Sequence, residues 1–90
     1  MLLLTRTPAL AYLNKVIVAE ITTTIRGIPQ EVELGASEGM PRPCVANFDN
    51  VHVVPLAVLE RQVGALAGER EHEVKRALGY ALDWAELKVL

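Results

Sequence analysis

Three consecutive threonines, Thr22, Thr23 and Thr24, lie at the end of the most β-branched stretch of the sequence, and their hydroxyl groups could take part in a reaction. Threonine favours strands, so β-propensity alone also explains this run. Alternate strand residues point to opposite faces, and at least one of these hydroxyls must therefore leave the apolar face. Near neutral pH a lone hydroxyl is neither a base nor a strong nucleophile. We expect Thr22 to act only with the help of another group.

Asp49 and Asn50 form an acid and amide pair between two apolar runs, residues 44–48 and 51–54. Both residue types tolerate positive φ, so the pair favours a two-residue hairpin turn or a tight bulge. The same side chains, exposed between strands, would offer hydrogen bonds to the edges of unpaired bases. Both interpretations stay open from the residues alone.

Arg6, Arg26 and Arg42 are isolated in the sequence, and each lies near a proline or a glycine. Arginines in such positions usually face solvent in loops. Three of them on neighbouring loops would also form a local rim that binds phosphate groups.

The remaining nucleophiles and metal-ligand types do not form a recognisable site. Ser37 lies in a glycine-flanked loop without a Gly-x-Ser-x-Gly elbow, so a triad with Asp49 and His52 is not expected. Cys44, His52 and His72 lack the spacing of a zinc site and are too few. We predict no metal site and no cofactor, and we expect Cys44 to be a small buried apolar residue.

Short apolar and β-branched runs must position these groups, and they indicate a mainly β fold. Residues 16–25 contain no glycine or proline and are the clearest strand, with a first half predicted to be buried on both faces. Residues 26–43 are expected to form a long loop that contains one half-exposed strand. The other predicted strands lie at residues 2–4, 31–34, 44–48, 51–54 and, as a last edge strand, 62–66.

One long helix is expected near the C-terminus, at about residues 69–84. Glu69 and Glu71 lie in its first turn, where the helix dipole favours acidic side chains. A short helical turn is expected at residues 56–60, after Pro55 ends the preceding strand. The apolar stripe of the long helix consists of Val74, Ala77, Leu78, Ala81, Leu82 and Ala85.

The composition places residues 1–90 in one folded domain. Hydrophobic residues make up 51% and charged residues 22%, which suffices for a packed core and excludes disorder. The net charge of −2 argues against binding duplex nucleic acid by bulk charge, so any nucleic-acid binding must be local. No apolar run approaches the roughly 18 residues of a membrane helix, and a single cysteine suits a reducing compartment. We expect a cytoplasmic protein with no membrane partner.

Several motifs in the same order resemble the MazF/PemK family of toxin endoribonucleases, and the likeness covers residues 2 to about 84. The resemblance implies a mainly β (α+β) fold, an SH3-like or CcdB-like bent β-barrel with a C-terminal α-helix. The motifs are residues 18–29 (VAEITTTIRGIP), the Glu31-Val32 strand, residues 43–51 (PCVANFDNV) and Val54-Pro55.

The same resemblance implies the function of a toxin in a type II toxin-antitoxin system. Family members are homodimers that cleave single-stranded RNA at short sequences without a metal ion, and a small cognate antitoxin silences them. Operator DNA would be reached only indirectly, through the antitoxin. The alternative function is a non-catalytic module of the same fold that dimerises or captures the antitoxin as a decoy.

By motif position, the resemblance implies that Thr22 is the catalytic threonine and that Asp49 and Asn50 contact RNA. We also predict Thr24 and Arg26 as RNA-binding residues. Family chemistry is attack of a ribose 2′-OH on the adjacent phosphate, which leaves a 2′,3′-cyclic phosphate and a 5′-OH. The protein must transfer protons and stabilise charge on the phosphate oxygens. A threonine hydroxyl answers only the second need.

In relatives the partner of this threonine is an arginine in an Arg-Pro pair directly before the strand that residues 2–4 represent. The sequence begins at Met1, after that position, and Arg6 lies beyond the strand and is not a substitute. Loss of such a group is expected to cost at least ~10³ in rate. We expect a start codon assigned too late in preference to a short and catalytically impaired chain.

Overall fold

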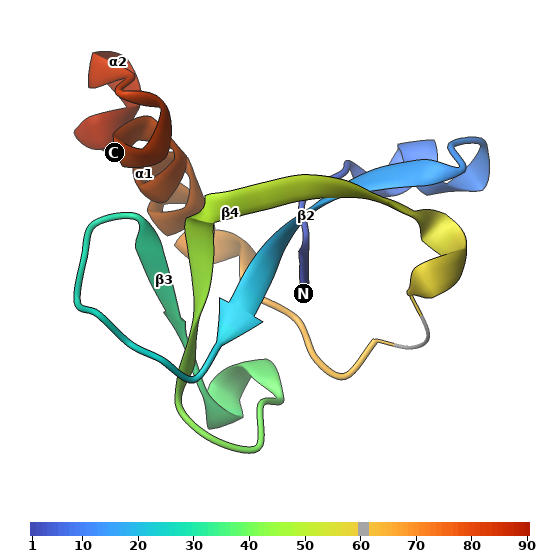
Figure 1. Ribbon diagram of the computed structural model, residues 1–90, viewed down its shortest axis with the longest axis horizontal. Helices are drawn as coiled ribbons and strands as arrows, with labels where there is room; N and C mark the ends of the chain where they lie inside the picture. The colour runs from blue at the N-terminus through green and yellow to red at the C-terminus, as the bar shows by residue number, and fades with distance from the viewer. Residues whose placement is uncertain (60–61) are drawn as a thin grey trace.

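The computed structural model describes residues 1–59 and 62–90 and contains a curled antiparallel sheet with helices at the C-terminal end (Figure 1). Within the described residues the sheet has four strands in the order β1-β2-β4-β3. The predicted mainly β, bent-sheet fold with a C-terminal helix is confirmed, in the form of a half-barrel. The strands are β1 (Leu2–Leu3), β2 (Lys15–Thr22), β3 (Glu31–Leu34) and β4 (Cys44–Pro55).

The two longest strands, β2 and β4, pair along their length but change register in the middle. Ala19 lies opposite Val51, whereas the next residue, Glu20, lies opposite Asn47. Residues 48–50 of β4 are therefore extra relative to β2 and form a bulge. Figure 1 shows β4 turning a sharp corner along its length.

The hairpin predicted at Asp49-Asn50 is wrong, and the alternative of a bulge is confirmed. A hairpin would pair residues 51–54 with residues 44–48. Instead both runs pair with β2 and together form the single strand β4. The choice between turn and bulge thus depends on a distant strand.

One apolar cluster joins the sheet to the first C-terminal helix. Cys44 belongs to it and is buried, as predicted. The prediction that the first half of β2 is buried on both faces is wrong, because Ile17 is 45% exposed between the buried Val16 and Val18. The buried members of the cluster are Ala19, Val32, Leu34, Cys44, Ala46, Phe48 and Ala77.

Helix α1 (Glu71–Leu82) follows a 3-10 turn at Gly68–Arg70 and is followed by α2 (Ala85–Lys88). The helix predicted at about residues 69–84 is confirmed in its body. None of the helices in residues 1–59 and 62–90 combines the length and the apolar character that crossing a membrane requires. Further 3-10 turns occupy Thr7–Ala11, Ala36–Glu38 and Leu56–Val58.

Helix α1 ends two residues before its predicted end because Asp83 takes a left-handed conformation, with φ of 52°. The N–H of Trp84 then donates to the carbonyl of Gly79 at 2.7 Å, which closes the helix end. Leu87 of α2 packs so close to Gly79 that a side chain there would overlap it. The two helices therefore form a tight corner.

The chain between β4 and α1 departs from one prediction. The 3-10 turn at Leu56–Val58 confirms the helical turn predicted there, while Glu60, the last residue of that prediction, lies outside the described residues. The edge strand predicted at residues 62–66 is wrong, since these residues form neither strand nor helix. Gly64 instead lies directly against the backbone of Glu38.

Replacing Gly64 by alanine is expected to lower the free energy of unfolding by about 1–3 kcal/mol, because the added methyl group would overlap the carbonyl of Glu38. Gly68→Ala is the matched control, since a Cβ at Gly68 meets nothing within 4 Å. Urea unfolding followed by circular dichroism compares the two variants. Equal stability of both proteins would contradict the close approach at Gly64.

Candidate functional site

Thr22 is the last residue of β2 and lies opposite Val45 of β4. Its Oγ1 accepts a hydrogen bond from the backbone N–H of Thr24 at 3.1 Å. This bond uses a lone pair of the hydroxyl oxygen, so it holds the oxygen in place and leaves the O–H proton free to donate. The side chain is half-buried. Thr22 is thus a positioned hydrogen-bond donor at the end of a strand.

The short turn made by this hydrogen bond also ends β2, three residues before the predicted end at residue 25. Serine and threonine side chains that bond to nearby backbone groups compete with the strand ladder in this way. The feature that ends the strand is therefore the same one that positions the hydroxyl.

An open hollow of about 130 Å³ lies beside Thr22, where the end of β2 meets the chain that leads into β4. Among its lining residues, Arg42 brings a positive charge and Thr22 and Thr23 bring hydroxyl groups. The lining consists of Ile21, Thr22, Thr23, Met40, Pro41, Arg42 and Cys44.

Asp49 and Asn50 are exposed at the bulge of β4. The buried side chain of Asn47 holds this bulge, since its Oδ1 accepts the N–H of Asp49 at 2.9 Å. Neither Asp49 nor Asn50 lines the hollow at Thr22. Val51, the residue after Asn50, lies opposite Ala19, which is three residues or roughly 10 Å along β2 from Thr22. The structure leaves both predicted RNA contacts accessible, outside the hollow at Thr22.

Thr24 and Arg26 are exposed in the loop between β2 and β3. The carboxylate of Glu31 holds this loop from inside. It accepts the backbone N–H groups of Arg26 at 3.2 Å, Gly27 at 2.9 Å and Ile28 at 3.4 Å. The backbone at Arg26 is therefore fixed although its side chain is at the surface.

The three arginines that the sequence marked as a phosphate-binding rim are not gathered in one pocket. The guanidinium of Arg6 donates to the hydroxyl of Tyr12 at 3.1 Å, after β1. Arg26 lies on the loop before β3, and Arg42 lines the hollow. Of the three, Arg42 is the one that shares a hollow with Thr22.

Sequence reasoning missed a contact between His52 and Glu20 on the same face of β2 as Thr22. His52 Nε2 lies 3.3 Å from Glu20 Oε1, with both side chains 41% exposed. Glu20 and Thr22 are two residues apart on one strand, so their side chains share a face. The two-residue spacing from Thr22 could have identified Glu20 as a residue on this face. Its contact with His52 could not be predicted, because it depends on the register of β4.

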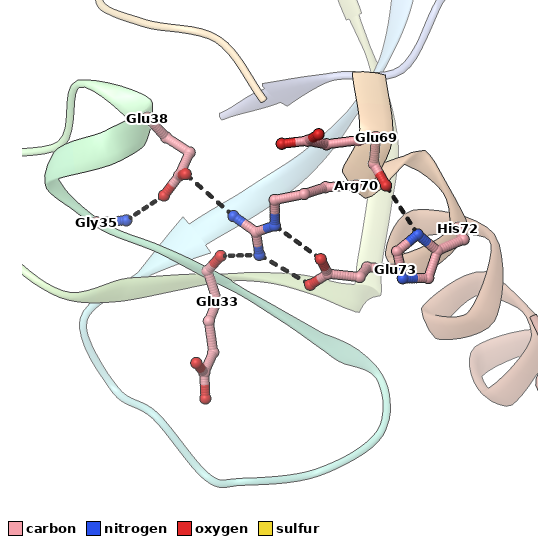
Figure 2. Close-up of polar contacts among 7 residues, drawn as sticks. All are labelled: Glu33, Gly35, Glu38, Glu69, Arg70, His72 and Glu73. Atoms are coloured by element: carbon pink, nitrogen blue, oxygen red, sulfur yellow. Dashed lines mark hydrogen bonds and ion pairs between the residues drawn. The ribbon is translucent and has the colours of Figure 1, made fainter. Parts of the chain in front are cut away.

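Arg70, at the start of α1, joins the helix to the edge of the sheet (Figure 2). Its guanidinium donates to Glu73 Oε2 at 2.7 Å and to the backbone carbonyl of Glu33 at 2.7 Å. It also pairs with Glu38 Oε2 at 3.1 Å, and Glu38 Oε1 accepts the N–H of Gly35 at 2.7 Å. This cluster, Arg70 with Glu33, Glu38 and Glu73, fixes α1 against β3.

The Arg70 cluster shifts both of its principal ionisable groups. The hydrogen bond from Arg70 lowers the pKa of Glu73 below its ordinary value, despite some desolvation. The same hydrogen bond raises the pKa of Arg70 above its ordinary value. The cluster is therefore a charged structural joint at neutral pH.

The geometry defines a small, curled β-sheet protein with a positioned hydroxyl and a cation beside one hollow. Residues 1–59 and 62–90 gather no three His, Cys, Asp or Glu side chains able to hold a metal ion. The family model of the PemK-like, MazF-like toxin of type II toxin-antitoxin system matches residues 1–82. The chain belongs to this family of endoribonuclease toxins.

Two curated relatives come from Mycobacterium tuberculosis. The chain is 41% identical over 85 residues to endoribonuclease MazF3, an alignment that covers 92% of this chain and 82% of that protein. It is 40% identical over 78 residues to the probable endoribonuclease MazF2, which covers 86% of this chain and 76% of that protein.

Solved structures show the same fold. The Mycobacterium tuberculosis toxin MazF-mt6 superposes with a TM-score of 0.88 at 40% identity, covering 91% of this chain and 83% of that one. A mycobacterial endoribonuclease solved in complex with its cognate antitoxin superposes with a TM-score of 0.77 at 24% identity. This superposition covers 91% of this chain and 78% of that one. The resemblance found in the sequence motifs is therefore confirmed.

Glu73→Gln is expected to lower the free energy of unfolding at neutral pH by about 1–2 kcal/mol, because it removes the charge that Arg70 binds. The pKa of Glu73 is lower in the folded protein than its ordinary value of about 4.5 in an unfolded chain. Its contribution to the free energy of unfolding is therefore fully present above that ordinary value and is lost as the pH falls through the lower, folded-state pKa. Stability of the variant should therefore fall less between neutral pH and acid. Urea unfolding at a series of pH values measures this.

Glu71→Gln is the matched control for that experiment. Glu71 pairs with Lys75 at 3.6 Å on the exposed side of α1, where such pairs are worth little. A Glu73 variant with the same pH dependence as the wild-type protein would contradict the role assigned to Arg70.

Proposed function

We propose that this chain is the toxin of a type II toxin-antitoxin pair and a sequence-specific endoribonuclease that cleaves single-stranded mRNA without a metal ion. The observation that carries the proposal is the positioned hydroxyl of Thr22 beside a hollow that also holds Arg42. Membership of the family and the name of the relative at 41% identity support the reaction class.

The proposed chemistry is in-line transfer within the RNA strand. The ribose 2′-oxygen bonds to phosphorus while the bond from phosphorus to the 5′-oxygen breaks. The 2′-OH loses a proton and the leaving 5′-oxygen gains one, which gives a 2′,3′-cyclic phosphate and a 5′-OH. Negative charge grows on the non-bridging oxygens, and Thr22 donates a hydrogen bond there. The resemblance assigns proton transfer to the arginine that precedes the first strand in relatives.

Asp49, Asn50, Thr24 and Arg26 are proposed as further RNA contacts. All four are exposed, so an unpaired strand can reach them. The bulge at Asp49 and Asn50 precedes Val51, which lies opposite Ala19, three residues or roughly 10 Å along β2 from Thr22, and this separation supports contacts to bases away from the cleaved phosphate. Contacts to base edges at that distance would select sequence without taking part in the reaction.

The proposed partners are a cognate antitoxin and a second copy of the chain, in the cytoplasm. One mycobacterial endoribonuclease of the same fold, at 24% identity, was solved in complex with its cognate antitoxin. Ile17 and Val53, paired at the outer end of the β2–β4 ladder, are 45% and 59% exposed and offer an apolar face for dimerisation. Operator DNA would be bound only through the antitoxin.

Thr22→Val is expected to reduce the rate of RNA cleavage about 10²–10³-fold, because it removes one donor to the developing charge while keeping the shape of the side chain. Ser37→Ala is the control for loss of an exposed hydroxyl, with unchanged cleavage expected. The assay uses labelled single-stranded RNA with EDTA present. It includes a form extended ahead of Met1 by a segment that ends in an Arg-Pro pair, as the family resemblance requires.

Cleavage by the wild-type protein in EDTA that Thr22→Val leaves unchanged would contradict the role of Thr22. Cleavage by neither the 90-residue form nor the extended form, with antitoxin binding retained, would overturn the nuclease proposal in favour of the non-catalytic decoy.

Asn50→Ala is expected to weaken RNA binding about tenfold and to relax base preference at one position, because a good contact to a base edge is worth about 1–3 kcal/mol. Asn14→Ala, an exposed asparagine before β2, is the matched control. Sequencing of the cleaved ends shows base preference, and anisotropy with a non-cleavable RNA gives affinity. An unchanged cleavage pattern and affinity for the Asn50 variant would rule out a role in RNA contact.

A further inference from the structure

Among the residues that the structure describes, the side chains of three cations, Lys15, Arg26 and Arg42, make neither a hydrogen bond nor an ion pair, and Arg42 is the one of them that lies beside Thr22. The side chains of Arg6, Arg70, Arg76, Lys75 and Lys88 all bond to protein groups. Arg42 makes no ion pair within residues 1–59 and 62–90, and it is exposed. It lines the hollow that also contains Thr22.

The backbone on both sides of Arg42 is restricted, which fixes the point from which its side chain leaves the chain. Pro41 and Pro43 flank it, so two backbone φ angles are set, and a residue before proline is restricted to extended conformations. Cys44, which follows Pro43, is buried and pairs with Leu34 of β3. Arg42 is thus held between two prolines and a buried strand end, and binding an anion would order little backbone.

The hollow matches a phosphodiester group in size and chemistry. Its volume of about 130 Å³ is several times the ~30 Å³ share of one water molecule, enough for phosphorus and its oxygens. Two of its lining residues, Thr22 and Arg42, carry the kinds of donor that phosphate accepts, a hydroxyl and a guanidinium. A protein of net charge −2 can bind a polyanion only through such local positive positions.

We propose that Arg42 and Thr22 form one subsite that binds the scissile phosphate of the RNA. The inference rests on the proposed nuclease function and adds a residue to it. Arg42 contacts one non-bridging oxygen and offsets the charge that grows there, while Thr22 donates to the same phosphate. Arg42 is therefore a catalytic residue supplied by the loop before β4.

The test compares Arg42→Ala, Arg42→Lys, Thr22→Val and the double variant, with Lys75→Ala as a control for loss of an exposed charge on α1. Affinity for a short single-stranded RNA with 2′-O-methyl riboses is measured over a range of salt concentrations. Cleavage of an unmodified RNA gives kcat and KM separately. Urea unfolding checks that exposed Arg42 does not support the fold.

We expect Arg42→Ala to reduce the slope of log affinity against log salt by about 0.7, the value for one phosphate contact on a single strand. Its kcat should fall about 30- to 300-fold. Arg42→Lys should restore the salt slope but only part of kcat, because lysine lacks the planar fork. The double variant should lose less than the product of the two single losses, since both residues act on one phosphate.

An unchanged salt slope for Arg42→Ala would overturn the subsite. A reduced slope with unchanged kcat would also overturn it, because Arg42 would then bind a phosphate away from the reaction. If neither the 90-residue form nor the form extended ahead of Met1 cleaves RNA, the proposed function fails and the affinity measurements alone decide. Coupled losses of affinity for Thr22 and Arg42 would then support a shared phosphate subsite, and independent losses would overturn it.

Discussion

The pairing of β2 with β4 is the constraint on which the rest of the structure depends. One strand, Lys15–Thr22, pairs with two successive runs of β4, and a register shift between Ala19 and Glu20 leaves residues 48–50 as a bulge. The same ladder carries Thr22 to its end, opposite Val45. The positions of the hydroxyl and of the bulge are therefore two consequences of one pairing, and neither moves without the other.

A sheet this small needs a second attachment to hold its edge strand, and the Arg70 cluster supplies it. β3 has only four residues, Glu31–Leu34, and one neighbouring strand. Arg70 bonds the backbone carbonyl of Glu33 and the carboxylates of Glu38 and Glu73, so the start of α1 is tied to that edge. Figure 2 shows the side chain of Glu33 directed away from Arg70, so this strand contributes its backbone and not its charge.

Local patterns in the sequence predicted the elements, while their partners set the details. Residues 31–34 and the body of α1 follow from alternation and helical periodicity, which depend on near neighbours. The bulge at Asp49 and the irregular path of residues 62–66 do not, because each depends on a distant segment: β2 in one case and the backbone of Glu38 in the other. The family motifs identified Thr22, but only the folded chain brings Arg42 to its hollow.

The face that carries Thr22 also carries acidic residues, which an RNA-binding surface must neutralise. Across the sheet, Glu20, Asn47 and Glu31 lie in one row, and opposite residues in a row share a face. Glu20 is paired with His52, and the carboxylate of Glu31 accepts three backbone N–H groups. The carboxylates of Glu20 and Glu31 thus have partners within the protein, so a local cation such as Arg42 can set the potential at the hollow in a chain that is acidic as a whole.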